Sequence, residues 1–190
     1  MRIPWGKTKP AILALLTMVS ACDPQASLPV LSSGDAGGGY KLSSGDQVRL
    51  ITFGEQSLSG EFGIDDSGYI ALPLVGPLHA NGLTTRGLAD EVTQALREKK
   101  LLASPNVVVE VIKYRPIFVL GEVQHPGPFP YQPHMTLLSA VALAGGFTPR
   151  AVKTRAVVVR SGPNEAVMGK LIPLSGLEPG DVITIPERTF

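Results

Sequence analysis

Cysteine is nearly absent from this chain of 190 residues, because Cys22 is its only one. A single cysteine excludes an internal disulfide and any cysteine-based zinc site of the usual type. The sequence also has no cluster of five or more Lys and Arg residues, and the formal net charge is only +1. The chain therefore lacks the basic surface with which a protein binds nucleic acid.

No apolar run is long enough to span a bilayer. The run at residues 10–18 follows a positively charged start and is shorter than the ~20 residues that a membrane helix needs, so it predicts an export signal. Ser20 and Ala21 directly before Cys22 resemble the lipobox of bacterial lipoproteins, although Val19 replaces the more usual leucine. The alternative is an ordinary secretory signal followed by an incidental cysteine.

The lipobox resemblance implies that residues 1–21 are a signal peptide, cut between Ala21 and Cys22. The Cys22 thiol, a better nucleophile than a hydroxyl at neutral pH, would receive a diacylglycerol. Each buried methylene contributes about 0.8 kcal/mol, so two or three acyl chains anchor a protein stably. Residues 22–39 are small, polar and glycine-rich, and predict a flexible tether with a span of ~20–25 Å. The folded part is then expected to begin near Tyr40, close to the membrane.

Glycine and proline are abundant, with 21 and 17 copies, which favours short strands and many turns. Ser44-Gly45-Asp46 predicts a turn into a strand at 47–53, whose two faces are both largely apolar and should both be covered. Asp65-Asp66-Ser67-Gly68 predicts a second turn, followed by one apolar strand at 69–76.

A helix and a strand complete the first half. Residues 84–100 predict a helix that Thr84 or Thr85 can cap, with an apolar face containing Leu88, Val92, Ala95 and Leu96. Residues 106–114 predict a strand, and Arg115-Pro116 a domain junction.

The second half predicts a buried strand at 117–123 and further strands at 156–160 and 170–174. Between the first two of these strands, Thr136 can cap a short helix at 137–144 that Gly145-Gly146 ends. Residues 178–186 repeat the Gly-Asp-then-strand pattern of Gly45-Asp46.

The first half resembles the signature domain of the outer-membrane polysaccharide export family. The residues that match its pattern are Tyr40, Leu42, Gly45, Asp46, Asp65, Gly68, Ile70, Leu72, Pro73, Gly76, Gly82, Leu83 and Thr84. The second half resembles a soluble-ligand-binding β-grasp (SLBB) domain. Its matching residues are Val119, Gly121, Val123, Pro126, Gly127, Leu138, Ala140, Leu143, Ala144, Gly145 and Gly146.

These resemblances imply an α+β chain with an export domain at 40–115, containing one helix, and an SLBB-like β-grasp domain at 116–190. They imply a non-catalytic, lipid-anchored periplasmic component of capsular or exopolysaccharide export. Its partners would be polysaccharide, further copies in a ring and an inner-membrane polysaccharide co-polymerase, with no membrane-spanning helix of its own. The alternative is a glycan-binding or adaptor lipoprotein that docks on an inner-membrane partner without forming a conduit. Proteins of this family usually lie at the outer membrane, whereas Asp23 after the lipidated position favours retention at the inner membrane.

The sequence contains no set of residues whose types and spacing predict catalysis or metal binding. His79, His125 and His134 lie in turns or loops without metal-binding spacing, so we expect neither a metal nor a cofactor. Asp65 and Asp66 are better explained by a turn than by an acid pair. Ser139 lacks a Gly-x-Ser-x-Gly elbow. We therefore expect no enzyme and no catalytic residue, and the sugar-contacting residues are unknown from sequence.

Overall fold

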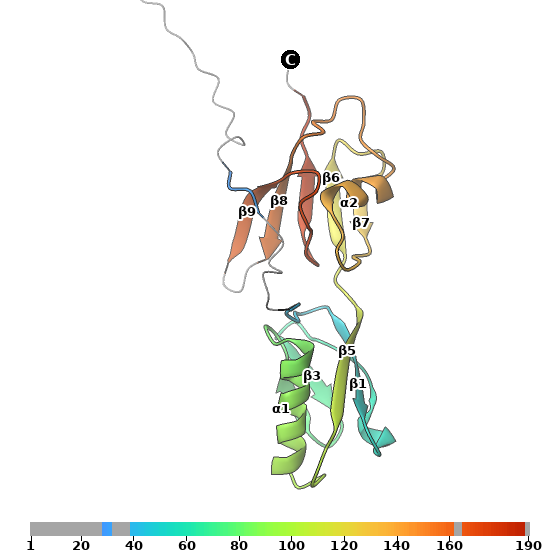
Figure 1. Ribbon diagram of the computed structural model, residues 1–190, viewed down its shortest axis with the longest axis vertical. Helices are drawn as coiled ribbons and strands as arrows, with labels where there is room; N and C mark the ends of the chain where they lie inside the picture. The colour runs from blue at the N-terminus through green and yellow to red at the C-terminus, as the bar shows by residue number, and fades with distance from the viewer. Residues whose placement is uncertain (1–27, 32–38, 162–164, 189–190) are drawn as a thin grey trace, which may run out of the picture.

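The computed structural model describes residues 28–31, 39–161 and 165–188. They form two modules that lie end to end along the long axis of the molecule (Figure 1). In chain order the elements are β1 (Gln47–Thr52), η1 (Gln56–Leu58), β2 (Gly60–Gly63), β3 (Tyr69–Leu72), β4 (Gly76–His79), α1 (Thr85–Glu98), β5 (Val107–Lys113), β6 (Ile117–Gly121), β7 (Gly127–Phe129), α2 (Leu137–Leu143), β8 (Ala156–Ser161), β9 (Ala166–Leu171) and β10 (Val182–Ile185). Short strands with a helix in each module confirm the predicted α+β class.

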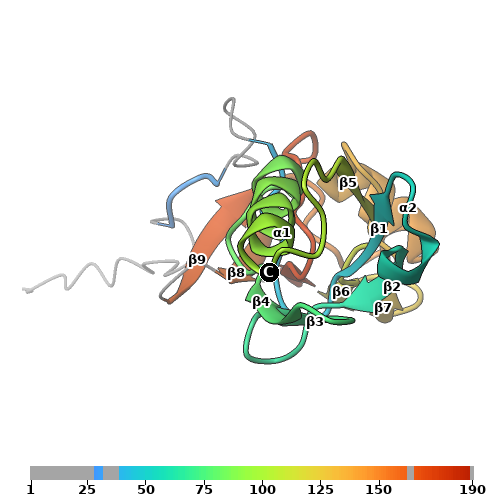
Figure 2. The same ribbon diagram turned by 90° about the horizontal axis from the view of Figure 1, so that it is seen from below.

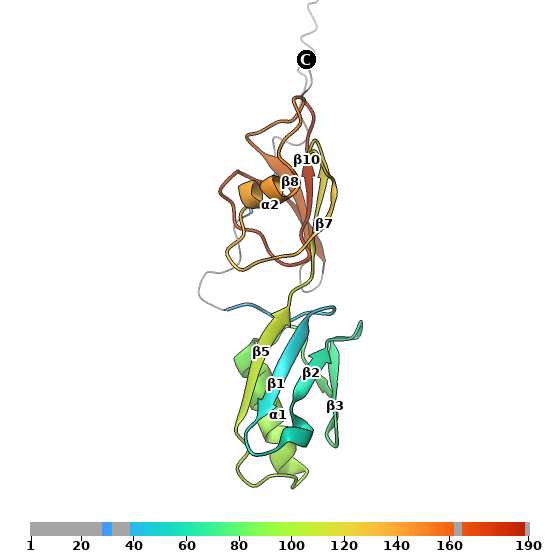
Figure 3. The same ribbon diagram turned by 90° about the vertical axis from the view of Figure 1, so that its right-hand side faces the viewer.

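The first module, elements β1 to β5 with α1, is built on an antiparallel sheet in the order β2-β1-β5 and a separate β3-β4 hairpin. Helix α1 lies on one side of that sheet (Figures 2 and 3). Its residues Leu88, Val92 and Leu96 are buried, as the helical spacing predicts, whereas Ala95 is only half-buried. They pack with Val48 and the rest of the first core. Fully burying one such side chain contributes about 1.5–3 kcal/mol.

The expectation that β1 is covered on both faces is wrong. Val48, Leu50 and Thr52 are buried, but Arg49 is exposed and Phe53, just after the strand, is 63% exposed. Helix α1 and the β3-β4 hairpin contribute to a core on one side of the three-stranded sheet. The other face therefore keeps its apolar side chains at the surface.

The single strand expected at 69–76 is two strands. The Asp65–Gly68 turn is confirmed, since the Gly68 amide donates to the Asp65 carbonyl at 2.9 Å. Strand β3 then stops before Pro73, which has no N–H for a ladder. Leu74 turns the chain with φ of 63°, and Gly76 continues into β4 with φ of 89°.

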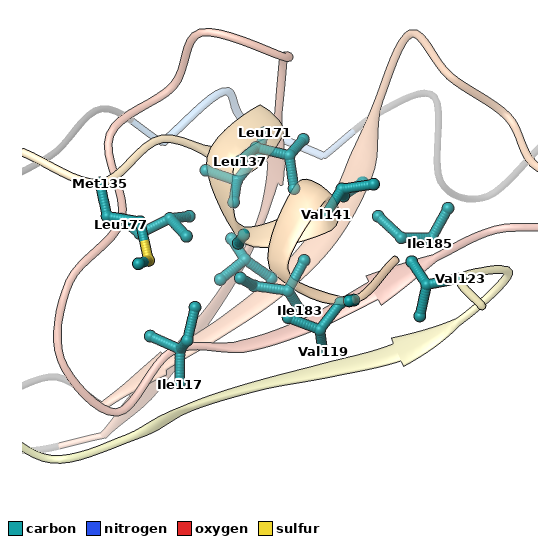
Figure 4. Close-up of a cluster of buried hydrophobic side chains, with 14 of the residues drawn as sticks. Ile117, Val119, Val123, Met135, Leu137, Val141, Leu171, Leu177, Ile183 and Ile185 are labelled. Atoms are coloured by element: carbon teal, nitrogen blue, oxygen red, sulfur yellow. The ribbon is translucent and has the colours of Figure 1, made fainter. Parts of the chain in front are cut away.

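The second module, elements β6 to β10 with α2, contains a five-stranded sheet in the order β7-β6-β10-β8-β9. Strand β10 runs parallel to β6 and the remaining pairs are antiparallel. Figure 4 shows Leu137 and Val141 of α2 beside Ile183 and Val119 of the sheet, all of them buried. The second core thus lies between one face of the sheet and helix α2.

Two strands of the second module differ from expectation. Strand β6 ends at Gly121 and is buried on one face only, because Phe118 and Leu120, on the face away from the core, are 39% and 40% exposed. The strand expected at 170–174 is β9, which lies earlier in the chain. Past Leu171 the chain turns, with the Ser175 amide donating to the Ile172 carbonyl at 2.9 Å.

The N-terminal expectations lie mostly outside the described residues, which include neither the signal segment 1–21 nor Ala21 and Cys22. Residues 28–31 are described, and they differ from a free tether because they pair with β9. Among the described residues, no helix is both long and apolar enough to cross a membrane.

Candidate functional site

Two Gly-Asp turns, one in each module, are built in the same way. Asp46 and Asp181 are both fully buried. The Ser43 amide donates to Asp46 Oδ2 at 2.9 Å, and the Glu178 amide donates to Asp181 Oδ2 at 2.9 Å. The repeat seen in the sequence is therefore a structural repeat, in which an aspartate side chain closes the turn that leads into a strand.

Each buried carboxylate has an arginine partner, as a buried charge requires. Arg160 donates to Asp181 through both Nε and Nη2, at 2.8 and 2.7 Å, in a two-pronged pair. The Arg115 backbone amide donates to Asp46 Oδ1 at 3.1 Å, and its Nε lies 3.6 Å from the same oxygen. The sequence did not single out either arginine as the partner of a Gly-Asp turn.

Arg115 lies between the two turns and so joins the modules. A Cβ built on Gly180 would lie 3.1 Å from Arg115 Nη1, and one built on Gly45 would lie 3.4 Å from Arg115 Cγ. Both glycines have positive φ, at 87° and 92°, which the turns require. A side chain at Gly180 would crowd the guanidinium from the second module.

Three tyrosines line the same junction edge to face. The Tyr40 and Tyr114 ring centroids are 5.1 Å apart, and those of Tyr114 and Tyr131 are 5.4 Å apart, with interplanar angles of 73° and 67°. Such pairs contribute about 0.5–1.5 kcal/mol beyond their buried area. One ring comes from each module and the central one from the segment between them.

Two of these tyrosines, Tyr40 and Tyr114, have raised pKa values. Burial, then the hydrogen bond and charge of Asp46, raise the pKa of Tyr40 well above its usual value, so its hydroxyl stays protonated and donates to Asp46 Oδ2 at 2.5 Å. Burial and the charge of Asp46 also raise the pKa of Tyr114. This junction, defined by Tyr40, Asp46, Tyr114, Arg115 and Tyr131, holds the modules together and presents no activated nucleophile.

A surface hollow of about 440 Å³ lies against α2 in the second module. Gln132, His134 and Ser139 line it with polar atoms, and Met135 and Leu143 line it with apolar ones. A second hollow, of about 500 Å³, follows the end of β1 around Phe53 and Gln56.

The groups considered for catalysis or metal binding are dispersed. His79 packs edge to face on Tyr69, with ring centroids 5.3 Å apart. A Cβ on Gly145, beyond the C-terminal end of α2, would lie 2.5 Å from His125 Nδ1, whereas His134 precedes the N-terminal end of that helix. Ser139 is engaged in the capping box of α2 with Thr136. Nowhere in the described part of the chain do three His, Cys, Asp or Glu side chains gather as metal ligands.

Comparison with known proteins matches the modules one by one. Residues 35–112 match the family model described as polysaccharide biosynthesis/export protein, and residues 116–171 match the SLBB domain. The exopolysaccharide production protein ExoF of Rhizobium meliloti (strain 1021) is 42% identical over 120 residues, which cover 56% of this chain. The polysialic acid transport protein KpsD of Escherichia coli is 28% identical over 159 residues, which cover 78% of this chain.

In each of these relatives the match covers 28% of the relative's own length. Both domain resemblances read from the sequence are confirmed by the family models. The chain thus contains a polysaccharide biosynthesis/export domain at residues 35–112, followed by an SLBB domain at residues 116–171.

Proposed function

We propose that this chain takes part in the export of an exopolysaccharide or capsular polysaccharide across the cell envelope. The observation that carries the proposal is the succession of an export domain and an SLBB domain on the two modules. Two similar proteins, named for exopolysaccharide production and polysialic acid transport, support the same substrate class. In this proposal the chain guides the polymer and does not cleave or extend it.

A moving polymer needs many weak contacts, because a tight site would stall it. The hollow beside α2 offers contacts of this kind, with the amide of Gln132 and the imidazole of His134 next to apolar side chains. The Arg115 junction supports the proposal in a second way. It holds both modules of one copy in a fixed relation, as repeated copies in a closed ring require.

The proposal includes a lipid anchor on Cys22, a periplasm-facing position and an inner-membrane co-polymerase as partner. The lipobox-like residues before Cys22 support the anchor. The usual location of the family that the chain resembles favours an anchor in the outer membrane. Asp23 favours the inner membrane and with it the adaptor alternative, in which the chain binds glycan and docks on an inner-membrane protein without forming a conduit.

Deletion of the gene tests the export proposal. We expect the deletion to lower the polysaccharide outside the cell, and wild-type protein supplied from a plasmid to restore it. Unchanged extracellular polymer would contradict the proposal. Polymer of unchanged amount but shorter or longer chains would point to an enzyme.

Mass photometry of the purified protein separates the ring from the adaptor. The ring predicts a discrete oligomer, whereas a strict monomer under all conditions supports the adaptor. Radiolabelled palmitate and fractionation of inner from outer membranes test the anchor and its address. Absence of label on the mature chain would contradict lipidation at Cys22.

A further inference from the structure

Residues 28–31 lie on the outer edge of the second module's sheet, beside β9 (Figure 1). The Lys170 amide donates to the Pro29 carbonyl at 2.8 Å, and the Leu31 amide donates to the Lys170 carbonyl at 2.9 Å. These two bonds form a parallel bridge between Val30 and Lys170. A segment that precedes the first module is thus attached to the second.

Gly169 of β9 provides a notch for this segment. A Cβ at Gly169 would lie 2.3 Å from Leu31 Cγ and 3.0 Å from the Pro29 carbonyl oxygen. Glycine in a strand interior is unfavourable and marks a close approach of another chain segment. Here the approaching group is Leu31, which packs against the second core.

The segment has the pattern of a short edge strand. Leu31 faces the core, whereas the neighbouring Val30 is 55% exposed, as alternation along a strand requires. Pro29 has no amide hydrogen, so the ladder cannot gain a further bond there. The segment also covers part of an edge that would otherwise offer unpaired backbone groups.

We propose that residues 28–31 are a docking strand that fastens the lipid-anchored N-terminal segment to the second module. The membrane part of this inference rests on the anchor at Cys22 proposed above. The eight residues from Cys22 to Pro29, the first residue that bonds β9, span at most about 28 Å when fully extended. The edge of β9 is therefore held within that distance of the lipid, and the second module is the one next to the membrane.

Exposed apolar side chains on the same part of the module agree with this orientation. Met168 on β9 is 54% exposed, and Ile172 and Leu174 in the turn that follows are 47% and 76% exposed. From the sequence we expected only that the folded part begins near Tyr40, close to the membrane, and not which module lies nearer to it.

Hydrogen exchange on the full mature protein tests the docking strand. We expect a protected Leu31 amide in the wild type and exchange faster by about tenfold or more in Leu31→Ala and Gly169→Val. Val30→Ala, in the same segment but exposed, is the matched control and should leave protection unchanged. Persisting protection of the Ile183 amide shows that the sheet is still folded in each variant.

Two results would overturn docking by the chain's own segment. One is a Leu31 amide that exchanges as fast in the wild type as in an unfolded peptide. The other is protection that rises with protein concentration, because the strand on β9 would then come from a neighbouring copy.

Quenching by headgroup-labelled lipid in phosphatidylglycerol vesicles tests the orientation. A fluorophore on Met168→Cys of the lipidated protein should be quenched more strongly than one on Glu98→Cys, at the far end of α1. Equal quenching, or stronger quenching at 98, contradicts the inference. Mass spectrometry of the same samples reports the acyl chains, so a failed anchor is distinguished from a failed docking strand.

Discussion

At the scale of single residues, Asp46 and Asp181 show how this fold tolerates buried charge. Neither has exposed surface, and each accepts a backbone amide from three residues earlier. The Gly-Asp pattern and its repetition could be predicted from the sequence. The arginine partners could not, because Arg160 reaches Asp181 only through the pairing of β8 with β10.

Replacement of Asp181 by Asn tests the two-pronged pair. The variant keeps the side-chain shape but leaves the Arg160 guanidinium, 12% exposed, without its nearest carboxylate charge. We expect the free energy of unfolding to fall by about 3–5 kcal/mol in urea titrations. Glu178→Gln is the matched control, because Glu178 is 35% exposed and its loss should cost less. Equal losses in the two variants would contradict this account.

The raised pKa of Tyr40 predicts a loss of stability in alkali. The folded state keeps a proton that the unfolded tyrosine releases near pH 10, so the contribution is complete below that pH and is lost as pH rises above it. We expect Tyr40→Phe to flatten the decline of the urea midpoint between pH 8 and pH 11. If the urea midpoints of the wild type and the variant decline in parallel with pH, Tyr40 is not the cause of the alkaline loss of stability.

At the scale of elements, the parallel pair β6-β10 depends on a close backbone approach at Gly121. A Cβ there would lie 2.2 Å from the Ile185 carbonyl oxygen, and φ is 81°. We expect Gly121→Ala to lower stability by about 2–5 kcal/mol, through both the clash and backbone strain. Gly54→Ala is the control, with φ of 85° but no atom within 4 Å of the added Cβ, and should cost about 1 kcal/mol. If the two variants lose similar amounts of stability, the close approach of the Ile185 carbonyl to Gly121 is not the reason for the loss.

Local sequence signals predicted the elements whose boundaries are set locally. Thr84 and Thr136 accept the helix-capping hydrogen bonds that their positions suggest, and Val107–Lys113 is a strand as its β-propensity predicts. Boundaries decided by distant contacts were missed. Leu31 can pack beside β9 only because Gly169, far along the chain, has no side chain to occupy that space.

At the scale of the whole molecule, the two modules are stacked end to end (Figure 3). They meet at Arg115 and the three tyrosines. The sequence indicated a junction at Arg115-Pro116 but not its contacts, since those depend on how the modules approach each other. The docking strand adds a second connection between the N-terminal segment and the distant module. Together these contacts fix the position of the two modules relative to each other and of residues 28–31 on the second module.

The ratio of polysaccharide outside the cell to polysaccharide retained within it tests the central claim most directly. We compare a deletion strain that carries the wild-type gene with one that carries Cys22→Ala, at matched protein levels. The account predicts a high ratio for the wild type, a low ratio for Cys22→Ala, and the same polymer chain length in both. Equal ratios in the two strains, or a change in chain length, would contradict it.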